Sequence, residues 1–144
     1  MPDPGRKGFH MLDTPAPLLY GYSDADWATT DIDERRTCIG YFVFLSGAAI
    51  FWLTRFWKPC LSTFEGELGA LTEVAKTTIA AREMLSSIPL SWYDENKDEP
   101  TTLLNDTAAT KQATDNPKHH SRVNDSRICE LQGTGAFKVL KYPD

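Results

Sequence analysis

The order of residue patterns along the chain predicts one α/β domain built on a mixed β-sheet. Three strand-like runs come first, a helix-like run of about 25 residues follows, and a short strand with further short elements completes the order. The length of 144 residues suits one ordinary domain with its own hydrophobic core. Because 41% of the residues are hydrophobic and 24% are charged, the composition is globular rather than disordered.

The first strand is expected over residues 17–23, where apolar and aromatic side chains follow one another. Residues 1–16 are rich in Pro and Gly and have no sustained period, so we expect an irregular lead-in and a folded domain over 17–144. The polar residues 29–34 predict a loop after the strand.

A β-hairpin is expected next. Residues 37–45 carry β-branched and aromatic side chains on both alternating faces, which is typical of a strand covered on both sides. Ser46 and Gly47 predict a turn, and residues 50–57 predict the returning strand.

The period then changes to that of a helix. Ser62 and Glu65 match a capping box at its start, and Pro89 stops it. Gly66 and Gly69 lie inside the helix and weaken it by about 1 kcal/mol each relative to Ala. The apolar stripe consists of Leu68, Leu71, Ala75, Ile79, Leu85 and Ile88.

The remaining elements are short. We expect a charged linker over residues 94–100, a strand over 101–105, a helix over 107–113 and a last strand over 137–142. The expected order is therefore β-β-β-α-β-α-β, a mixed sheet of about five strands with flanking helices.

Three acidic residues end or begin these elements. Asp24 ends the first strand-like run, Glu67 opens the helix-like run, and Asp106 ends the fourth strand-like run. When different strands and helices bring acidic side chains to one place, those side chains suit a hard cation such as Mg²⁺. This ion takes few carboxylates and keeps several waters. Each acid also has a structural reading: Asp24 as a turn residue, Glu67 as a helix-start acid favoured by the dipole, and Asp106 as a helix N-cap.

The segments around these acids resemble the ribonuclease H domain of Ty1/copia-type retrotransposon Pol polyproteins. Residues 21–28 read G-Y-S-D-A-D-W-A and agree with the family motif at all eight positions. Residues 62–71 resemble its S-S-T-E-A-E-Y-I-A-L, residues 103–106 its L-Y-C-D, and residues 116–122 its N-P-x-x-H-S-R. The resemblance covers roughly residues 18–122.

The resemblance implies a ribonuclease H-like fold in which the first and fourth strands lie side by side and parallel. It implies that Asp24, Glu67 and Asp106 are the catalytic, metal-binding residues and that His120 and Arg122 contact the substrate. The implied reaction cuts the RNA strand of an RNA–DNA hybrid with two Mg²⁺ ions, or Mn²⁺, about 3.5–4 Å apart. One ion activates the attacking water and the other stabilises the leaving oxygen. The implied setting is intracellular (cytoplasm, virus-like particle or nucleus), beside the reverse transcriptase portion of the same polyprotein.

Some residues depart from the family pattern. Asn105 replaces a residue that is usually small or apolar, and Asp26 belongs to the first motif without being an expected ligand. The family's fourth acid has no aligned counterpart unless Asp125 or Asp144 stands in. A catalytically inactive remnant or interaction module with the same fold is therefore the alternative function. An integrase or transposase core is less favoured, because those enzymes use the order Asp, Asp, Glu.

The net charge of −5 is unusual for a nucleic-acid enzyme, since phosphate contacts supply most non-specific affinity. Two explanations stay open. The acids gather at the metal site while residues 35–36, 55–58 and 118–122 form basic patches, or neighbouring domains of a longer polyprotein supply affinity.

The cysteines and the hydropathy bear on the setting. Cys38, Cys60 and Cys129 are far apart with no C-x-x-C spacing, which favours reduced thiols inside a cell and argues against a zinc ribbon. No apolar run approaches the roughly 20 residues that span a bilayer, so no membrane partner is expected.

Overall fold

The computed structural model describes residues 18–27, 36–60, 62–89, 93, 98–106 and 135–141. The expected lead-in over 1–16, the helix expected over 107–113, and the residues His120 and Arg122 lie outside the described residues.

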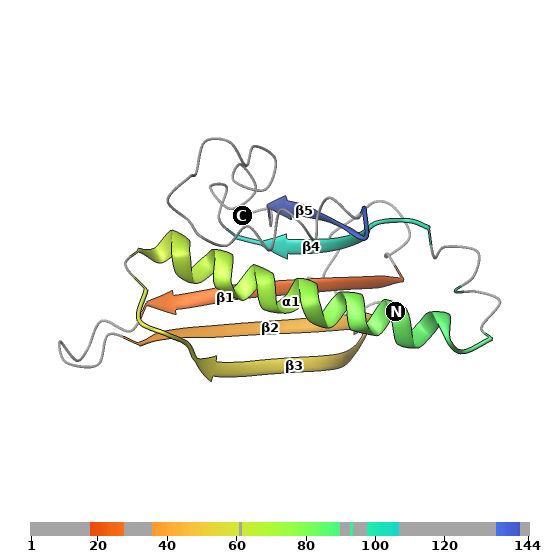
Figure 1. Cartoon of the computed structure of the whole chain (residues 1–144), viewed down its shortest axis with the longest axis horizontal. Coiled ribbons are helices and arrows are strands. Elements are labelled where there is room, and N and C mark those ends of the chain that lie inside the picture. The colour runs from red at the N-terminus through yellow and green to blue at the C-terminus, as the bar shows by residue number, and fades with distance from the viewer. Residues whose placement is uncertain are drawn as a thin grey trace, which may run out of the picture.

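The described chain forms a five-stranded mixed sheet with one long helix across it (Figure 1). The strand order in the sheet is β3-β2-β1-β4-β5. Strand β1 is antiparallel to β2 and β2 to β3, whereas β4 is parallel to both β1 and β5. The elements are β1 (Leu19–Trp27), β2 (Thr37–Leu45), β3 (Ala48–Phe56), α1 (Thr63–Ser86), β4 (Thr101–Asn105) and β5 (Phe137–Lys141). The predicted α/β class and the parallel pairing of the first and fourth strands are confirmed.

Strand β1 is longer than the sequence pattern indicates. Its parallel pairing with β4 ends at Ser23 and Asn105, but its antiparallel pairing with β2 continues to Trp27. Asp24 was expected to end the strand, and it instead lies within β1 opposite Gly40. The reason is that β2 continues to satisfy the backbone of β1 after β4 has ended.

The β2–β3 connection is the predicted tight turn. Ser46 and Gly47 have φ values of 49° and 85°. Positive φ at both central residues is the geometry of the two-residue hairpin turns whose twist matches the flanking strands. Gly47 adopts this conformation without a steric cost, because it has no Cβ.

Helix α1 begins at a side-chain cap. The backbone N–H of Glu65 donates to the Ser62 hydroxyl at 3.2 Å, as the capping box predicts. The Glu65 carboxylate forms an ion pair with Lys58 at 3.0 Å. The helix ends at Ser86, three residues before Pro89.

The hydrophobic core lies between α1 and the sheet face that the helix crosses (Figure 1). Val43, Leu71, Val74 and Leu103 are each 0% exposed there. A Cβ on Gly21 would lie 2.8 Å from Cγ2 of Val74, so the missing side chain is what lets the helix pack this closely on β1.

The opposite face of the sheet carries aromatic side chains. Tyr20 and Phe44 stack with ring centroids 5.1 Å apart. Phe42 is 47% exposed and its cross-strand neighbour Trp52 is 67% exposed. The expectation that residues 37–45 are covered on both sides is therefore wrong, because only the side chains that face α1 are fully buried.

Candidate metal centre

Three carboxylates from three separate elements meet at one edge of the sheet. Asp24 comes from β1, Glu67 from α1, and Asp106 from the position directly after β4. One oxygen of each lies within 4.8 Å of the others. Asp24 and Asp106 are exposed, whereas Glu67 is only 3% exposed. The sequence singled out these three residues, and the structure brings them together.

The strand register explains the convergence of the two aspartates. Ser23 pairs with Asn105 in the parallel β1–β4 ladder. Asp24 and Asp106 are the next residues in each case, and parallel strands deliver such residues to the same edge.

Close packing of the helix explains the third acid. A Cβ on Gly66 would lie 2.8 Å from Cγ2 of Thr37, which is too close for an ordinary contact. Gly66 therefore allows the first turn of α1 to approach β1 and β2 and to bring Glu67 against β1. The helical pattern predicts only a cost in helix stability at Gly66, and the close approach explains why a glycine stands there.

The Glu67 carboxylate is held at both oxygens. Its Oε1 accepts a hydrogen bond from the Ala25 backbone N–H at 3.3 Å, and its Oε2 accepts one from Asn105 Nδ2 at 2.8 Å. Burial raises the pKa of Glu67 from its ordinary 4.5 to about 7, with the nearby Asp106 and Asp24 charges adding to the effect. The two hydrogen bonds partly oppose this rise.

Asn105 is the residue whose importance sequence reasoning missed. It is 2% exposed, and its amide also donates to the carbonyl oxygen and the hydroxyl of Ser23, each at 3.3 Å. The available signal was a polar side chain at the end of an apolar strand, directly before a candidate ligand. That signal was noted only as a departure from the family pattern.

The donor set fits a small divalent cation. Mg²⁺ binds oxygen at 2.0–2.1 Å in octahedral geometry, so ligands on opposite sides lie about 4.2 Å apart. One oxygen from each acid lies within 4.8 Å of the others, which is close to this spacing. Asp24 and Glu67 also share one donor, the Ala25 N–H, so this N–H compensates each carboxylate only in part. Such a concentration of negative charge favours a bound cation.

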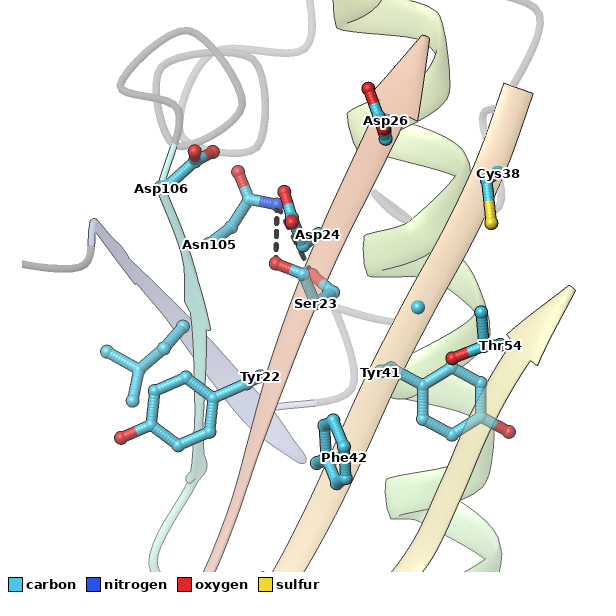
Figure 2. Close-up of a pocket in the computed structure, with 12 residues that line it drawn as sticks. Tyr22, Ser23, Asp24, Asp26, Cys38, Tyr41, Phe42, Thr54, Asn105 and Asp106 are labelled. Carbon is cyan, nitrogen blue, oxygen red and sulfur yellow. Dashed lines mark hydrogen bonds between the residues drawn. The ribbon is translucent and has the colours of Figure 1, made fainter. Parts of the chain in front are cut away.

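A pocket of about 450 Å³ adjoins the acids on the sheet face opposite α1 (Figure 2). Asp24, Asp106 and Asn105 line one part of it, and Tyr22 and Phe42 line another. Figure 2 shows the Asp24 and Asp106 side chains on either side of the Asn105 amide. Asp26 also lines this pocket, but it is not one of the three acids whose oxygens converge.

The basic patch expected over residues 55–58 is engaged with the helix. Arg55 bonds to Glu73 at 3.0 Å and lies 5.4 Å from the centre of the Trp57 ring. Lys58 pairs with Glu65. Acids of α1 therefore offset part of the positive charge of this patch. The patch expected over 118–122 lies outside the described residues, as does Arg35.

Two further expectations concern the setting. Cys38 and Cys60 are free thiols, and Cys129 is outside the described ranges. Within the part of the chain that the structure describes, no helix has the length and apolar character needed to cross a bilayer.

Solved structures with a similar fold include ribonucleases H. The ribonuclease H1 of the archaeon Halobacterium salinarum matches 87% of the chain with a TM-score of 0.54 and 11% identity, over 85% of its own length. LC11-RNase H1, isolated from compost by a metagenomic approach, matches 87% of the chain and 84% of its own with a TM-score of 0.57 and 14% identity. The protein therefore has the ribonuclease H fold.

Sequence relatives narrow this class. The chain is 34% identical over 131 residues to the retrovirus-related Pol polyprotein from transposon TNT 1-94 of Nicotiana tabacum. It is 39% identical over 62 residues to the secreted RxLR effector protein 161 of Plasmopara viticola. These matches cover 87% and 42% of the chain, but only 9% and 43% of the relatives' own lengths. No family model matches. Sequence and fold agree that the chain is a ribonuclease H-like domain related to retrotransposon Pol polyproteins.

Proposed function

We propose that this chain is the metal-dependent ribonuclease H domain of a copia-type retrotransposon polyprotein and cuts the RNA strand of RNA–DNA hybrids. The observation that carries the proposal is the convergence of Asp24, Glu67 and Asp106 within 4.8 Å at the edge of a ribonuclease H-like sheet. The relationship to a Pol polyprotein over 87% of the chain supports the assignment.

The three acids differ in role because they differ in exposure. Asp24 and Asp106 are exposed, so they can hold a cation on the side that a phosphodiester approaches. Glu67 is buried behind them and would hold the cation from the protein side. When bound, Mg²⁺ supplies an activated water and stabilises charge on the leaving oxygen. Without a cation, the three carboxylates would repel the phosphates of the hybrid.

The proposed partner is an RNA–DNA hybrid, and recognition would use the 2′-hydroxyls of its RNA strand. LC11-RNase H1, which shares the fold, has also been solved in complex with an RNA/DNA hybrid. His120 and Arg122 remain our proposed substrate contacts, and the reverse transcriptase portion of the same polyprotein remains a proposed neighbour. We place this activity inside the cell, in agreement with the free thiols of Cys38 and Cys60.

The test is cleavage of a labelled RNA–DNA hybrid with Mg²⁺ and with a chelator. The unchanged chain should cut only with Mg²⁺. Asp24→Asn should reduce the rate by roughly a thousandfold, because loss of a ligand removes several kcal/mol of metal-based stabilisation. Asp26→Asn is the matched control, since Asp26 lies on the same strand and lines the same pocket outside the three acids. It should retain activity within about fivefold, a change of about 1 kcal/mol.

Two outcomes contradict the proposal. Hybrid cleavage that survives Asp24→Asn would place the chemistry elsewhere. Mn²⁺ binding that depends on Asp24, without any hybrid cleavage, would favour the inactive interaction module.

A further inference from the structure

We propose that Asn105 positions Glu67 for metal binding by holding its buried carboxylate in the orientation that faces Asp24 and Asp106. The inference rests on the proposed function, because it concerns a residue that supports the same metal site. Asn105 would not touch the metal or the hybrid, so it would be a positioning residue rather than a catalytic one.

The orientation of the Asn105 amide follows from its neighbours. The Ser23 carbonyl oxygen and Glu67 Oε2 are both acceptors, so they require the NH₂ group and not the amide oxygen. One N–H makes the short 2.8 Å bond to Glu67. The other is directed to the Ser23 carbonyl and hydroxyl oxygens, both at 3.3 Å. Asn105 thereby ties β1, β4 and α1 together at the point where the acids meet.

The two donors to Glu67 leave its carboxylate ready for a cation. A carboxylate oxygen has two lone-pair positions. Ala25 occupies one on Oε1 and Asn105 one on Oε2, so each oxygen keeps a position for a metal. Without such donors, a glutamate with several rotatable bonds would have to be ordered by the cation itself, which costs affinity.

The chemistry of an amide suits this task. A Lys or Arg at position 105 would also donate to Glu67, but its positive charge would compete with the cation for the carboxylates. The neutral amide fixes the orientation and adds no positive charge that competes with the cation. An apolar side chain such as Leu or Val at this position could not donate a hydrogen bond to Glu67.

The experiment compares Mn²⁺ affinity in two buried variants of β4, measured by electron paramagnetic resonance. Asn105→Leu keeps the size of the side chain and removes the donor. It should weaken Mn²⁺ binding by about tenfold or more, the usual effect of losing such a supporting contact.

Thr101→Val is the matched control, because Thr101 is 4% exposed and accepts a hydrogen bond from Arg82 at 2.9 Å, far from the acids along the strand. This control should keep Mn²⁺ affinity within about twofold. Unfolding curves of both variants show that any difference is not a loss of folded protein.

A second measurement covers the case in which Asn105→Leu does not fold. In the unchanged chain, the side-chain NH₂ signals of Asn105 should shift on addition of Mg²⁺, because their carboxylate partner takes up the cation. The same titration of Glu67→Gln should show little shift. NH₂ signals that stay unmoved at saturating Mg²⁺ in the unchanged chain would overturn the inference.

Metal affinity and hybrid cleavage separate the two proposals. If Asn105→Leu binds Mn²⁺ as tightly as the unchanged chain does, the proposed role of Asn105 is overturned and the ribonuclease assignment stands. If Asn105→Leu weakens Mn²⁺ binding but the unchanged chain cuts no hybrid, only the ribonuclease assignment is overturned. A chain that binds no divalent metal overturns both.

Discussion

The interface between α1 and the sheet has two adjacent regions with opposite chemistry. In the first, Gly21, Val74 and Leu103 form a dry apolar contact so close that a methyl group on Gly21 would not fit. Two residues further along β1 and β4, Asn105 donates hydrogen bonds to Ser23 and to the buried carboxylate of Glu67. The same helix and the same strands build both regions.

The difference separates what stabilises the fold from what the site requires. Burial of apolar side chains contributes roughly 25 cal/mol per Å², so the first region favours folding. The second region keeps a carboxylate 3% exposed, and its pKa of about 7 records the cost of ionising it there. A protein tolerates such a region when the buried charge has a function.

The largest change in the free energy of unfolding should come from a substitution in the apolar region. Leu103→Ala should lower the free energy of unfolding by about 3–4 kcal/mol, because it leaves a cavity where the side chain is 0% exposed. Urea denaturation measures this loss. The Mn²⁺ affinity of the folded molecules should be unchanged, because Leu103 belongs to the apolar contact with Gly21 and Val74 and not to the metal centre. Leu140→Ala, at a half-buried position of β5, is the control and should cost less. A loss below about 1 kcal/mol for Leu103→Ala would show that the interface is not tightly packed.

The polar region should make stability depend on pH. The pKa of Glu67 is raised in the folded state, so the folded protein binds the proton more tightly than the unfolded chain. This tighter proton binding stabilises the folded protein fully below about pH 4.5. The stabilisation is lost as the pH rises through about 7, which lowers the free energy of unfolding by about 3 kcal/mol.

Glu67→Gln isolates this contribution, because a neutral amide does not titrate. Metal-free unfolding curves from pH 4 to pH 9 should fall less steeply for Glu67→Gln than for the unchanged chain. Glu65→Gln changes the more exposed glutamate of the same helix turn. Its unfolding free energy should depend on pH as steeply as that of the unchanged chain. Addition of Mg²⁺ at pH 8 should stabilise the unchanged chain and not Glu67→Gln. Equal pH slopes for the two variants would contradict the burial of Glu67 as the cause.

Gly21→Ala tests how closely the apolar region is packed. The added methyl would lie 2.8 Å from Cγ2 of Val74 and 3.0 Å from Cδ2 of Leu103, so we expect a loss of about 2 kcal/mol in unfolding free energy. Gly40→Ala is the matched control on β2, since the added methyl would lie 3.7 Å from its nearest neighbours, Leu53 O and Thr54 Oγ1. If both substitutions cost the same in thermal denaturation, strand propensity rather than close packing explains the loss.

The smallest effect should come from the start of α1, which borders the polar region. Ser62→Ala removes the acceptor for the Glu65 N–H and should cost about 1 kcal/mol. Glu65→Gln loses a partly exposed ion pair with Lys58 and should cost only a few tenths of that, about 0.3 kcal/mol. Chemical denaturation at pH 7 measures both. A larger loss for Glu65→Gln would mean that its carboxylate, and not the Ser62 hydroxyl, is the main cap.

Local patterns in the sequence determined most of the fold. The bounds of β2 and β4 agree with the predicted strands, and the start of α1 agrees with its capping signal. These features depend on residues a few positions apart, so side-chain period and turn chemistry identify them. The three acids were also identified from sequence, through motifs that resemble a known family.

Only the tertiary structure decided how these acids are supported. It buried Glu67 and left Glu65 at the helix surface, extended β1 past Asp24, and turned Gly66 into a point of close approach. It also joined Asn105 to Glu67 and to Ser23, residues 38 and 82 positions away in the chain. Such contacts depend on strand register and helix placement, and no short-range pattern records them. The sequence alone therefore singled out three carboxylates as candidate ligands, whereas the packing of α1 on β1 and β4 decided how they are held.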